Sequence, residues 1–203
     1  MTSSNELIIV GNTLQSAGNT DILITKQNSA GQILWEQTFA GTAGSYDYGL
    51  AVTLDNSQNV LVAGVVTTSN QTTDIALLKY SPSGSLLWSS IIDGGNNQFD
   101  VATSLTCDAN DNIYLVGGTI SPSSQSDWYV TKFNNNGTQL WNTSYDFANL
   151  QELPISVKII GGGNIAVGGF SNSSVAVWDF VELSFSGVDG AILSENRETI
   201  PDL

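Results

Sequence analysis

The chain has 203 residues, of which 41% are hydrophobic, enough to bury a core, but only 12% are charged, about half the usual quarter. Its 19 acidic and 5 basic side chains leave a net charge of −14, which disfavours binding to nucleic-acid phosphates and to anionic lipid. Histidine is absent, so Ser-His-Asp triads and histidine-ligated metal sites are excluded, and the single Cys107 cannot form an intramolecular disulfide.

No segment of the sequence is typical of a membrane span. The longest apolar runs, 7–10 and 60–66, are far shorter than the roughly 20 residues that cross a bilayer. The N-terminal sequence MTSSNELIIVG lacks a basic region and turns at once into strand-like sequence, so it does not fit a signal peptide. We expect that a leader has been removed or that the chain is an internal piece of a longer protein.

The sequence repeats itself about every 53 residues. Glycines that close apolar runs are spaced by 53, 53 and 52 residues: Gly11, Gly64, Gly117 and Gly169. Other residue types recur in the same register: Asp21, Asp74, Asp127 and Asp179; Lys26, Lys79 and Lys132; Gly31, Gly84 and Gly137; Trp35, Trp88 and Trp141. So many positions in register indicate tandem copies of one structural unit.

We therefore expect one repeat domain over 1–203, with copies at approximately 6–58, 59–111, 112–163 and 164–203. The fourth copy is degenerate. Ser184 stands at its lysine position and Ser194 at its tryptophan position, and one inserted residue moves its glycine to Gly190.

Each copy reads as four short strands. In the second copy these are 59–66, 74–80, 84–92 and 100–108, separated by turn sequences such as SPSG. The run 75–80 is apolar on both faces, which favours a sheet packed between two neighbouring sheets. No helical periodicity is evident. Four-stranded units of this length predict an all-β fold of β-propeller blades.

The chain carries a repeated pattern, D-hydrophobic-K-[YF]-x-x-x-G-x-x-x-W, followed by D-x-[GA]-x-x-[LV]-x-x-D and N-[VI]-x-[LV]-x-G. In this pattern the chain resembles the SBBP-type β-propeller repeat of secreted and cell-surface bacterial and archaeal proteins. The resemblance extends from Glu6 to about Arg197. It implies a propeller, an extracellular or cell-surface location, and a binding or scaffolding role. It also implies that the innermost strand of each blade is the segment GLAVTLD or ATSLTCD.

If each blade begins with this innermost strand, the sequence predicts 15 strands, three in the first blade and four in each of the others. The first copy starts in its second strand at Glu6, and no C-terminal segment matches an innermost strand. The first blade therefore has an open edge. We expect this edge to be covered by further copies of the chain or by further repeats of a longer protein, so that the four blades form an open arc of a larger or oligomeric propeller.

The run Asp108 to Asn112 is similar to a calcium loop, because Asp and Asn oxygens suit a hard cation. Neutral residues occupy the glycine and glutamate positions of an EF-hand loop, so a hairpin turn is favoured and no metal is expected. The motif SGSLLW is similar to pyrroloquinoline-quinone-type repeats, but the chain lacks a vicinal cysteine pair and a convincing ligand set. We expect no cofactor.

The periodic lysines are expected to act as struts between blades, with their amines paired to a periodic acid such as Asp47 or Asp100; a ring of substrate-binding lysines is the alternative. The periodic tryptophans are expected to be largely buried as wedges between blades.

Aromatic side chains beside carboxylates precede the predicted innermost strands and form a candidate ligand rim. The rim consists of Tyr46, Asp47, Tyr48, Phe99, Asp100, Tyr145 and Asp146, followed by Phe147. Such residues could bind a carbohydrate or a peptide, or the aspartates could cap turns while the aromatics close the blade edge. Four acceptor sequons, at Asn70, Asn136, Asn142 and Asn172, become glycosylation sites only if the source organism glycosylates exported proteins.

The sequence thus favours a non-catalytic extracellular propeller module that binds or scaffolds in a surface assembly, with a protein partner or further copies of itself. A glycan- or peptide-binding lectin-like propeller that uses the rim is the alternative. A carboxylate-dependent lyase or hydrolase is less favoured, because pairs such as Asp47 and Asp100 are explained by repetition alone.

Overall fold

The computed structural model of the chain describes residues 5–16, 18–43, 45–68, 72–95, 98–120, 125–147, 150–174 and 177–199. Over these residues it contains fifteen strands, one three-residue 3-10 turn (Gly161–Gly163) and no α-helix. The all-β prediction of 15 strands is confirmed.

The strands form four antiparallel sheets in chain order, the first of three strands and the others of four. The first contains β1 (Leu7–Ser16), β2 (Asn19–Gln27) and β3 (Ile33–Phe39). The second contains β4 (Tyr48–Leu54), β5 (Val60–Thr67), β6 (Thr73–Tyr80) and β7 (Leu86–Ile92). The third contains β8 (Asp100–Cys107), β9 (Ile113–Ile120), β10 (Ser126–Phe133) and β11 (Gln139–Tyr145). The fourth contains β12 (Glu152–Ile159), β13 (Ile165–Ser174), β14 (Val177–Phe185) and β15 (Ile192–Thr199).

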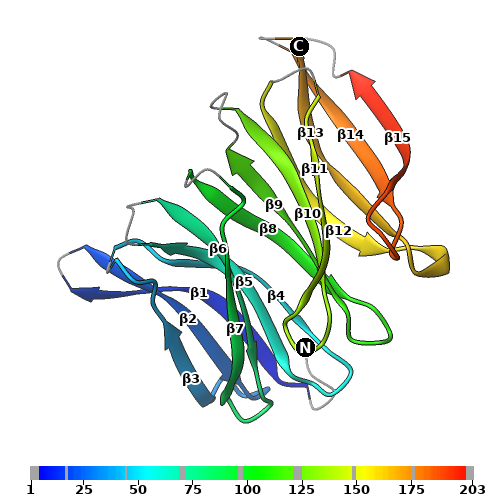
Figure 1. Cartoon of the computed structure of the whole chain (residues 1–203). Helices are drawn as coiled ribbons and strands as arrows, with labels where there is room; N and C mark the ends of the chain where they lie inside the picture. Colours follow the sequence, from blue (N-terminus) through cyan, green and yellow to red (C-terminus); the bar gives the residue numbers. More distant parts are fainter. Residues whose placement is uncertain are drawn as a thin grey trace.

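The sheets follow one another side by side, with the first and the last at opposite ends of the array (Figure 1). We call them blades one to four. Each complete blade starts with a strand from the end of one sequence copy, as predicted: β4, β8 and β12 pair with β5, β9 and β13. In the described part of the chain β1 pairs with β2 alone, so it is an edge strand.

Three cores fill the three junctions between blades. Ile22 and Ile24 of β2 pack on Val60 and Val62 of β5 at the first junction, and two similar clusters fill the second and third. The strands of blades two and three contribute alternate side chains to the cores on either side. Residues Val60–Thr67 of β5 are therefore all buried, and the prediction of sheets that are apolar on both faces is confirmed.

The periodic glycines of the second strands have no Cβ, which allows the backbone of the neighbouring innermost strand to approach closely. A Cβ on Gly64 would lie 2.3 Å from the carbonyl oxygen of Tyr48, and one on Gly117 would lie 2.2 Å from that of Val101. Gly11 is the equivalent residue of blade one, and a Cβ there would meet nothing within 4 Å. The space that an innermost strand fills in the other blades is open beside Gly11.

Candidate functional site

Asp47 and Asp100 of the predicted rim are buried and bind backbone amides. Asp47 accepts hydrogen bonds from the N–H groups of Gly41 (2.6 Å) and Thr67 (2.7 Å), and Asp100 accepts one from Gly94 N–H (2.7 Å). These two rim carboxylates are therefore not accessible to a ligand, because backbone donors between blades need an acceptor when they are buried. The turn-capping alternative holds for both.

The rim aromatics divide into exposed and enclosed groups. Tyr46 and Tyr48 are exposed and stacked, with ring centroids 6.4 Å apart, and Phe99 is exposed as well. Tyr145 is buried, and its hydroxyl bonds to Glu195 and Arg197. The Phe147 ring lies 3.7 Å beneath the Arg197 guanidinium. Of the rim aromatics, therefore, Tyr46, Tyr48 and Phe99 offer rings to a ligand.

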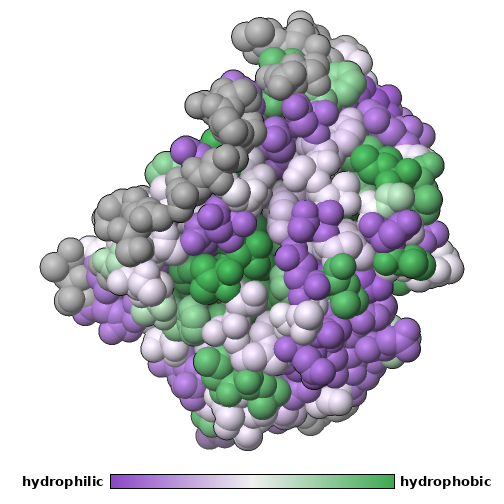
Figure 2. Space-filling view, in the orientation of Figure 1, coloured by the Kyte–Doolittle hydropathy of each residue, from purple (hydrophilic) through white to green (hydrophobic). Residues whose placement is uncertain are grey.

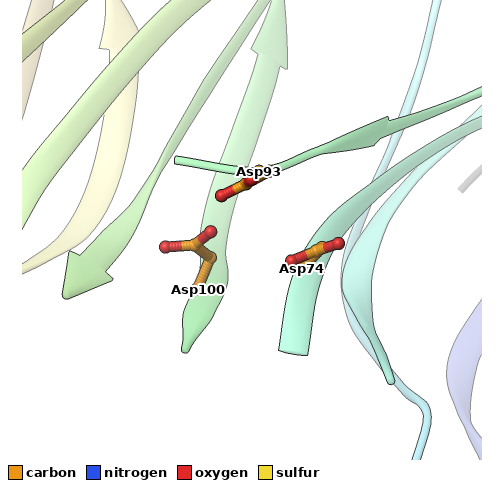
Figure 3. A group of neighbouring side chains, drawn as sticks. All are labelled: Asp74, Asp93 and Asp100. Carbon is orange, nitrogen blue, oxygen red and sulfur yellow. The ribbon is translucent and has the colours of Figure 1, made fainter. Parts of the chain in front are cut away.

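Two clusters of three acids form where one blade meets the next. In the first, Asp74 is the second residue of β6, Asp93 follows β7, and Asp100 begins β8 of the next blade. One carboxylate oxygen of each lies within 4.8 Å of the others, and Figure 3 shows the three carboxylates gathered between these strands. Equivalent positions in the next junction form the second cluster, Asp127, Asp146 and Glu152. We call them the second-junction and third-junction acid clusters.

Glu152 is the most enclosed member of the third-junction cluster, with 1% of its surface exposed. Its Oε1 accepts hydrogen bonds from Phe147 N–H (3.1 Å) and from the Ser171 hydroxyl (3.3 Å), whereas its buried Oε2 has no hydrogen-bond partner. Burial, with a smaller contribution from the charges of Asp146 and Asp127, raises the pKa of Glu152 to about 7. Burial also raises the pKa of Asp100 to about 6, assisted by Asp93 and Asp74.

The first junction and the last blade lack a complete cluster. At the first junction Asp21 and Asp47 are present, but Ala40 stands where the other junctions have Asp93 and Asp146. In blade four, Asp179 stands at the position of Asp74 and Asp127, and it forms an ion pair with Arg197 at 3.1 Å.

Of the periodic lysines, Lys79 pairs with a periodic acid, as predicted, but this acid is Asp55 and not Asp47 or Asp100. Lys79 forms a buried ion pair with Asp55 at 2.8 Å, and Lys26 pairs with Glu6 at 2.9 Å. Lys132 donates to the Gly187 carbonyl at 2.6 Å. The expected pairing with Asp47 and Asp100 is wrong, because the lysines and these two aspartates lie at opposite ends of the strands. The role as a strut is confirmed, since Lys79 also contacts Asn135 of the next blade.

The periodic tryptophans lie between blades, where each is partly buried and packs against the core of its junction. The indole N–H groups of Trp35 and Trp88 donate to carbonyls of the following blade, at Pro82 and Asn135. A turn glycine in a left-handed conformation covers each ring, as Gly137 (φ 80°) covers Trp88. The fully buried indole is that of Trp128.

The calcium-like run is a hairpin turn. Asp108 Oδ1 accepts from the N–H groups of Asn110 and Asn112, and its Oδ2 accepts from the Asn112 side chain. Asp55 makes the same bonds one repeat earlier. These carboxylates are occupied by donors of their own turn, as turn chemistry predicts.

Two of the four sequons remain accessible in the described structure. Asn136 and Asn142 are exposed. Asn172 is only 8% exposed, so this conditional site is not accessible in the folded chain. Asn70 lies outside the described residues.

The acid clusters are not evident from any one loop of the sequence. Each cluster combines three strands of two blades, so spacing within one loop does not indicate it. The available signal was the recurrence of acids at three repeat positions, Asp74 with Asp127, Asp93 with Asp146, and Asp100 with Glu152. Among the described residues no helix is long and apolar enough to cross a membrane.

Comparison with known proteins supports the fold and gives a distant relative. No family model matches the chain. It is 26% identical over 188 residues to the Regulatory protein FlaEY of Caulobacter vibrioides, a match that covers 80% of this chain and 19% of that protein. The chain thus spans about a fifth of the length of this relative.

Among solved structures, the chain is similar to the subtype N11 neuraminidase-like protein of A/flat-faced bat/Peru/033/2010 (H18N11). The TM-score is 0.50 at 12% identity, over 92% of this chain and 46% of that one. Drosophila Plexin A, solved in complex with Semaphorin 1b, gives a TM-score of 0.31 at 10% identity, over 90% of this chain and 53% of that one. The chain has a β-propeller-like fold.

Proposed function

We propose that the chain is a non-catalytic β-propeller module of the SBBP repeat type that scaffolds an extracellular or cell-surface assembly. Its partner in this proposal is a sheet of its own kind, from another copy of the chain or from further repeats. The observation on which the proposal rests is the uncovered outer face of blade one. The repeat pattern, the low content of charged residues and the abundance of small polar ones support the location.

The outer face of blade one exposes residues that are buried in every other blade. Leu7 and Ile9 of β1 are each 43% exposed. Their equivalents in blade two, Val60 and Val62, are 1% and 0% exposed because blade one covers them. The same repeat position thus specifies a surface for another blade, and an exposed apolar strand at a sheet edge favours association.

The backbone just before β1 has the conformation that precedes the second strand in other blades. Asn5 has a left-handed backbone (φ 57°), as do Gln58 (φ 62°) and Asp111 (φ 61°), which lie in the turns between innermost and second strands. The turn geometry that leads from an innermost strand is therefore present before β1. Together with the open space beside Gly11, this favours occupation of the edge by a strand from outside the described chain.

Blade four presents a different apolar face at the other end of the array. Leu153, Phe170 and Trp178 line an apolar groove there, and Phe170 packs edge-on against Phe180. Figure 2 shows hydrophobic patches separated by hydrophilic surface, one of them over the outer strands of the last sheet. Because the two end faces differ, we propose that blade one of one copy meets blade four of the next, which is a heterologous contact.

Light scattering of the full chain tests the assembly. We expect a particle larger than one chain. The double variant Leu7→Lys and Ile9→Lys should be monomeric with an unchanged circular dichroism spectrum. Leu140→Lys, which changes an equally exposed leucine on β11, should leave the particle size unchanged. A monomeric native chain at high concentration would contradict self-assembly.

Ligand binding at the rim is a second candidate function, and the stacked, exposed Tyr46 and Tyr48 favour it. A glycan array with the native chain and with Tyr46→Ala tests it.

We propose that the acid clusters are not catalytic, because they recur at equivalent positions of successive junctions, as a structural feature of the repeat would.

A further inference from the structure

We propose that the second-junction and third-junction acid clusters each bind a calcium ion that joins one blade to the next. The chain would then hold two equivalent ions, one between blades two and three and one between blades three and four. This inference does not depend on the proposed assembly, because each site lies within a single chain.

The clusters bring three carboxylates to one point from two different blades. Asp74 and Asp93 belong to the second strand pair of one blade, and Asp100 begins the innermost strand of the next. Each acid places an oxygen within 4.8 Å of the other two. Three negative charges at this separation repel one another, so a cation between them would turn a destabilising junction into a cross-link.

Glu152 indicates that something besides the protein occupies the third-junction cluster. Its Oε2 is buried and accepts no hydrogen bond, although its Oε1 accepts two. A buried carboxylate oxygen without a partner is costly, and buried charges are normally paired or coordinate metals. The acids that face Glu152 are Asp127 and Asp146, and neither can neutralise it.

In blade four a positive charge neutralises the acid at this repeat position. Asp179 is equivalent to Asp74 and Asp127, and there the chain supplies a guanidinium, with Arg197 Nη1 3.1 Å from Asp179 Oδ2. Among the described residues no lysine or arginine forms an ion pair with Asp74, Asp93 or Asp100 of the second-junction cluster, or with Glu152 of the third. A cation from solution would do at two junctions what Arg197 does in blade four.

The donor set fits calcium. Carboxylate oxygens are hard ligands, and calcium accepts six to eight oxygens in a flexible arrangement that includes waters and bidentate carboxylates. Asp93 and Asp146 are exposed, so each cluster has an open side where water can complete the shell. Magnesium requires a stricter octahedron and gives up its waters reluctantly, which suits such a site less well.

Calorimetric titration of the chelator-treated full chain with calcium chloride at pH 7.5 and 0.15 M salt tests the proposal. We expect two ions per chain, with dissociation constants of about 10⁻⁵ to 10⁻³ M. Asp93→Asn should remove one ion, Asp146→Asn the other, and the double variant both. Asp189→Asn, which removes a charge at an exposed turn far from both clusters, should retain two.

The melting temperature gives a second measurement that does not depend on any variant. We expect it to rise by more than about 5 °C in 10 mM calcium and to return with chelator, because a ligand of the folded state stabilises by mass action. Absence of both binding and a rise would overturn the proposal and would mean that the buried acids hold protons. Undiminished binding by the folded double variant would also overturn it, by placing the ions elsewhere on the acidic surface.

The first junction allows the reverse experiment. Ala40→Asp adds the missing acid beside Asp21 and Asp47, at an exposed position. We expect a third ion per chain. A folded variant that still binds two would contradict the claim that the three repeated acids are sufficient.

Discussion

The indoles of Trp88 and Trp128 differ in what surrounds them, although both lie at blade junctions. Trp128 is 0% exposed and packs against Tyr145, with its N–H donating to the Phe170 carbonyl. Trp88 is half-buried beneath Gly137. A tryptophan on the outermost strand of a blade therefore removes less apolar surface from water than one inside the junction.

Replacing the two tryptophans should reveal this difference. We expect Trp128→Ala to lower the free energy of unfolding by about 3 to 5 kcal/mol, the range for buried aromatic truncations, and Trp88→Ala by about 2 kcal/mol. Chemical denaturation measures both. Equal losses would show that the covering turn encloses Trp88 more fully in solution.

The raised pKa values of Glu152 and Asp100 make stability depend on pH when no metal is present. Both groups hold a proton more tightly in the folded chain than their ordinary values of 4.5 and 3.8. The folded state therefore binds more protons in the window from about 4 to 7, and stability falls as pH rises through it. Well above pH 7 both groups are ionised in both states, and their contribution to stability no longer changes with pH.

In chelator, we expect a melting temperature several degrees lower at pH 8 than at pH 5. Glu152→Gln should reduce the difference, because its amide does not ionise, whereas the exposed Glu198→Gln should leave it unchanged. Scanning calorimetry across this range is the measurement. A melting temperature that rises between pH 5 and pH 8 would contradict the assignment.

At the scale of the strands, Lys79 at the end of β6 connects three parts of the fold. Its ammonium pairs with Asp55 after β4 and contacts Asn135 in the turn that follows β10. Burial acts to raise the pKa of Asp55, but the hydrogen bonds from Lys79 and Asn59 outweigh it and lower that pKa. The carboxylate thus stays charged and depends on the lysine.

Lys79→Met should lower the free energy of unfolding by about 3 to 5 kcal/mol, because it leaves a buried carboxylate without its cation. The double variant Lys79→Met and Asp55→Asn should lose less than the sum of the two single changes. The exposed Lys158→Met is the control, with an expected effect within about 0.5 kcal/mol. An additive double variant would show that the two residues do not act as a pair.

These elements show which features the sequence can predict. The 53-residue period and the alternation of apolar runs with turns predict the strands and their grouping, because both are local properties. The partner of a lysine depends on which end of a strand it occupies relative to the next blade. For the same reason the sequence leaves two alternatives for Asp47 and Asp100, ligand binding or turn capping. Folding brings the amides of Gly41 and Gly94 onto them, which favours capping.

For the whole molecule, the difference between the end blade and the inner blades is concentrated in β1. In blade two the inner strand β4 lies so close that a Cβ on Gly64 has no room, whereas Gly11 faces open space. Gly64→Ala should therefore be strongly destabilising. Gly11→Ala in a dilute, unassembled chain should change the free energy of unfolding by less than about 0.5 kcal/mol.

Blade one has three strands in the described part of the chain, and adding a fourth beside β1 should make Gly11 equivalent to Gly64. Met1 corresponds to Leu54 in the repeat, so a copy of residues 45–53 placed before Met1 would supply the inner strand in register. In this extended chain we expect slower hydrogen exchange at the amides of β1, and Gly11→Ala should become destabilising, since the added backbone would pass as close as Tyr48 passes Gly64. A scrambled nine-residue extension is the control and should change neither quantity. If the correct extension leaves exchange at β1 unchanged, the edge of blade one does not accept a strand, and the close approach seen at Gly64 and Gly117 depends on features that the first copy lacks.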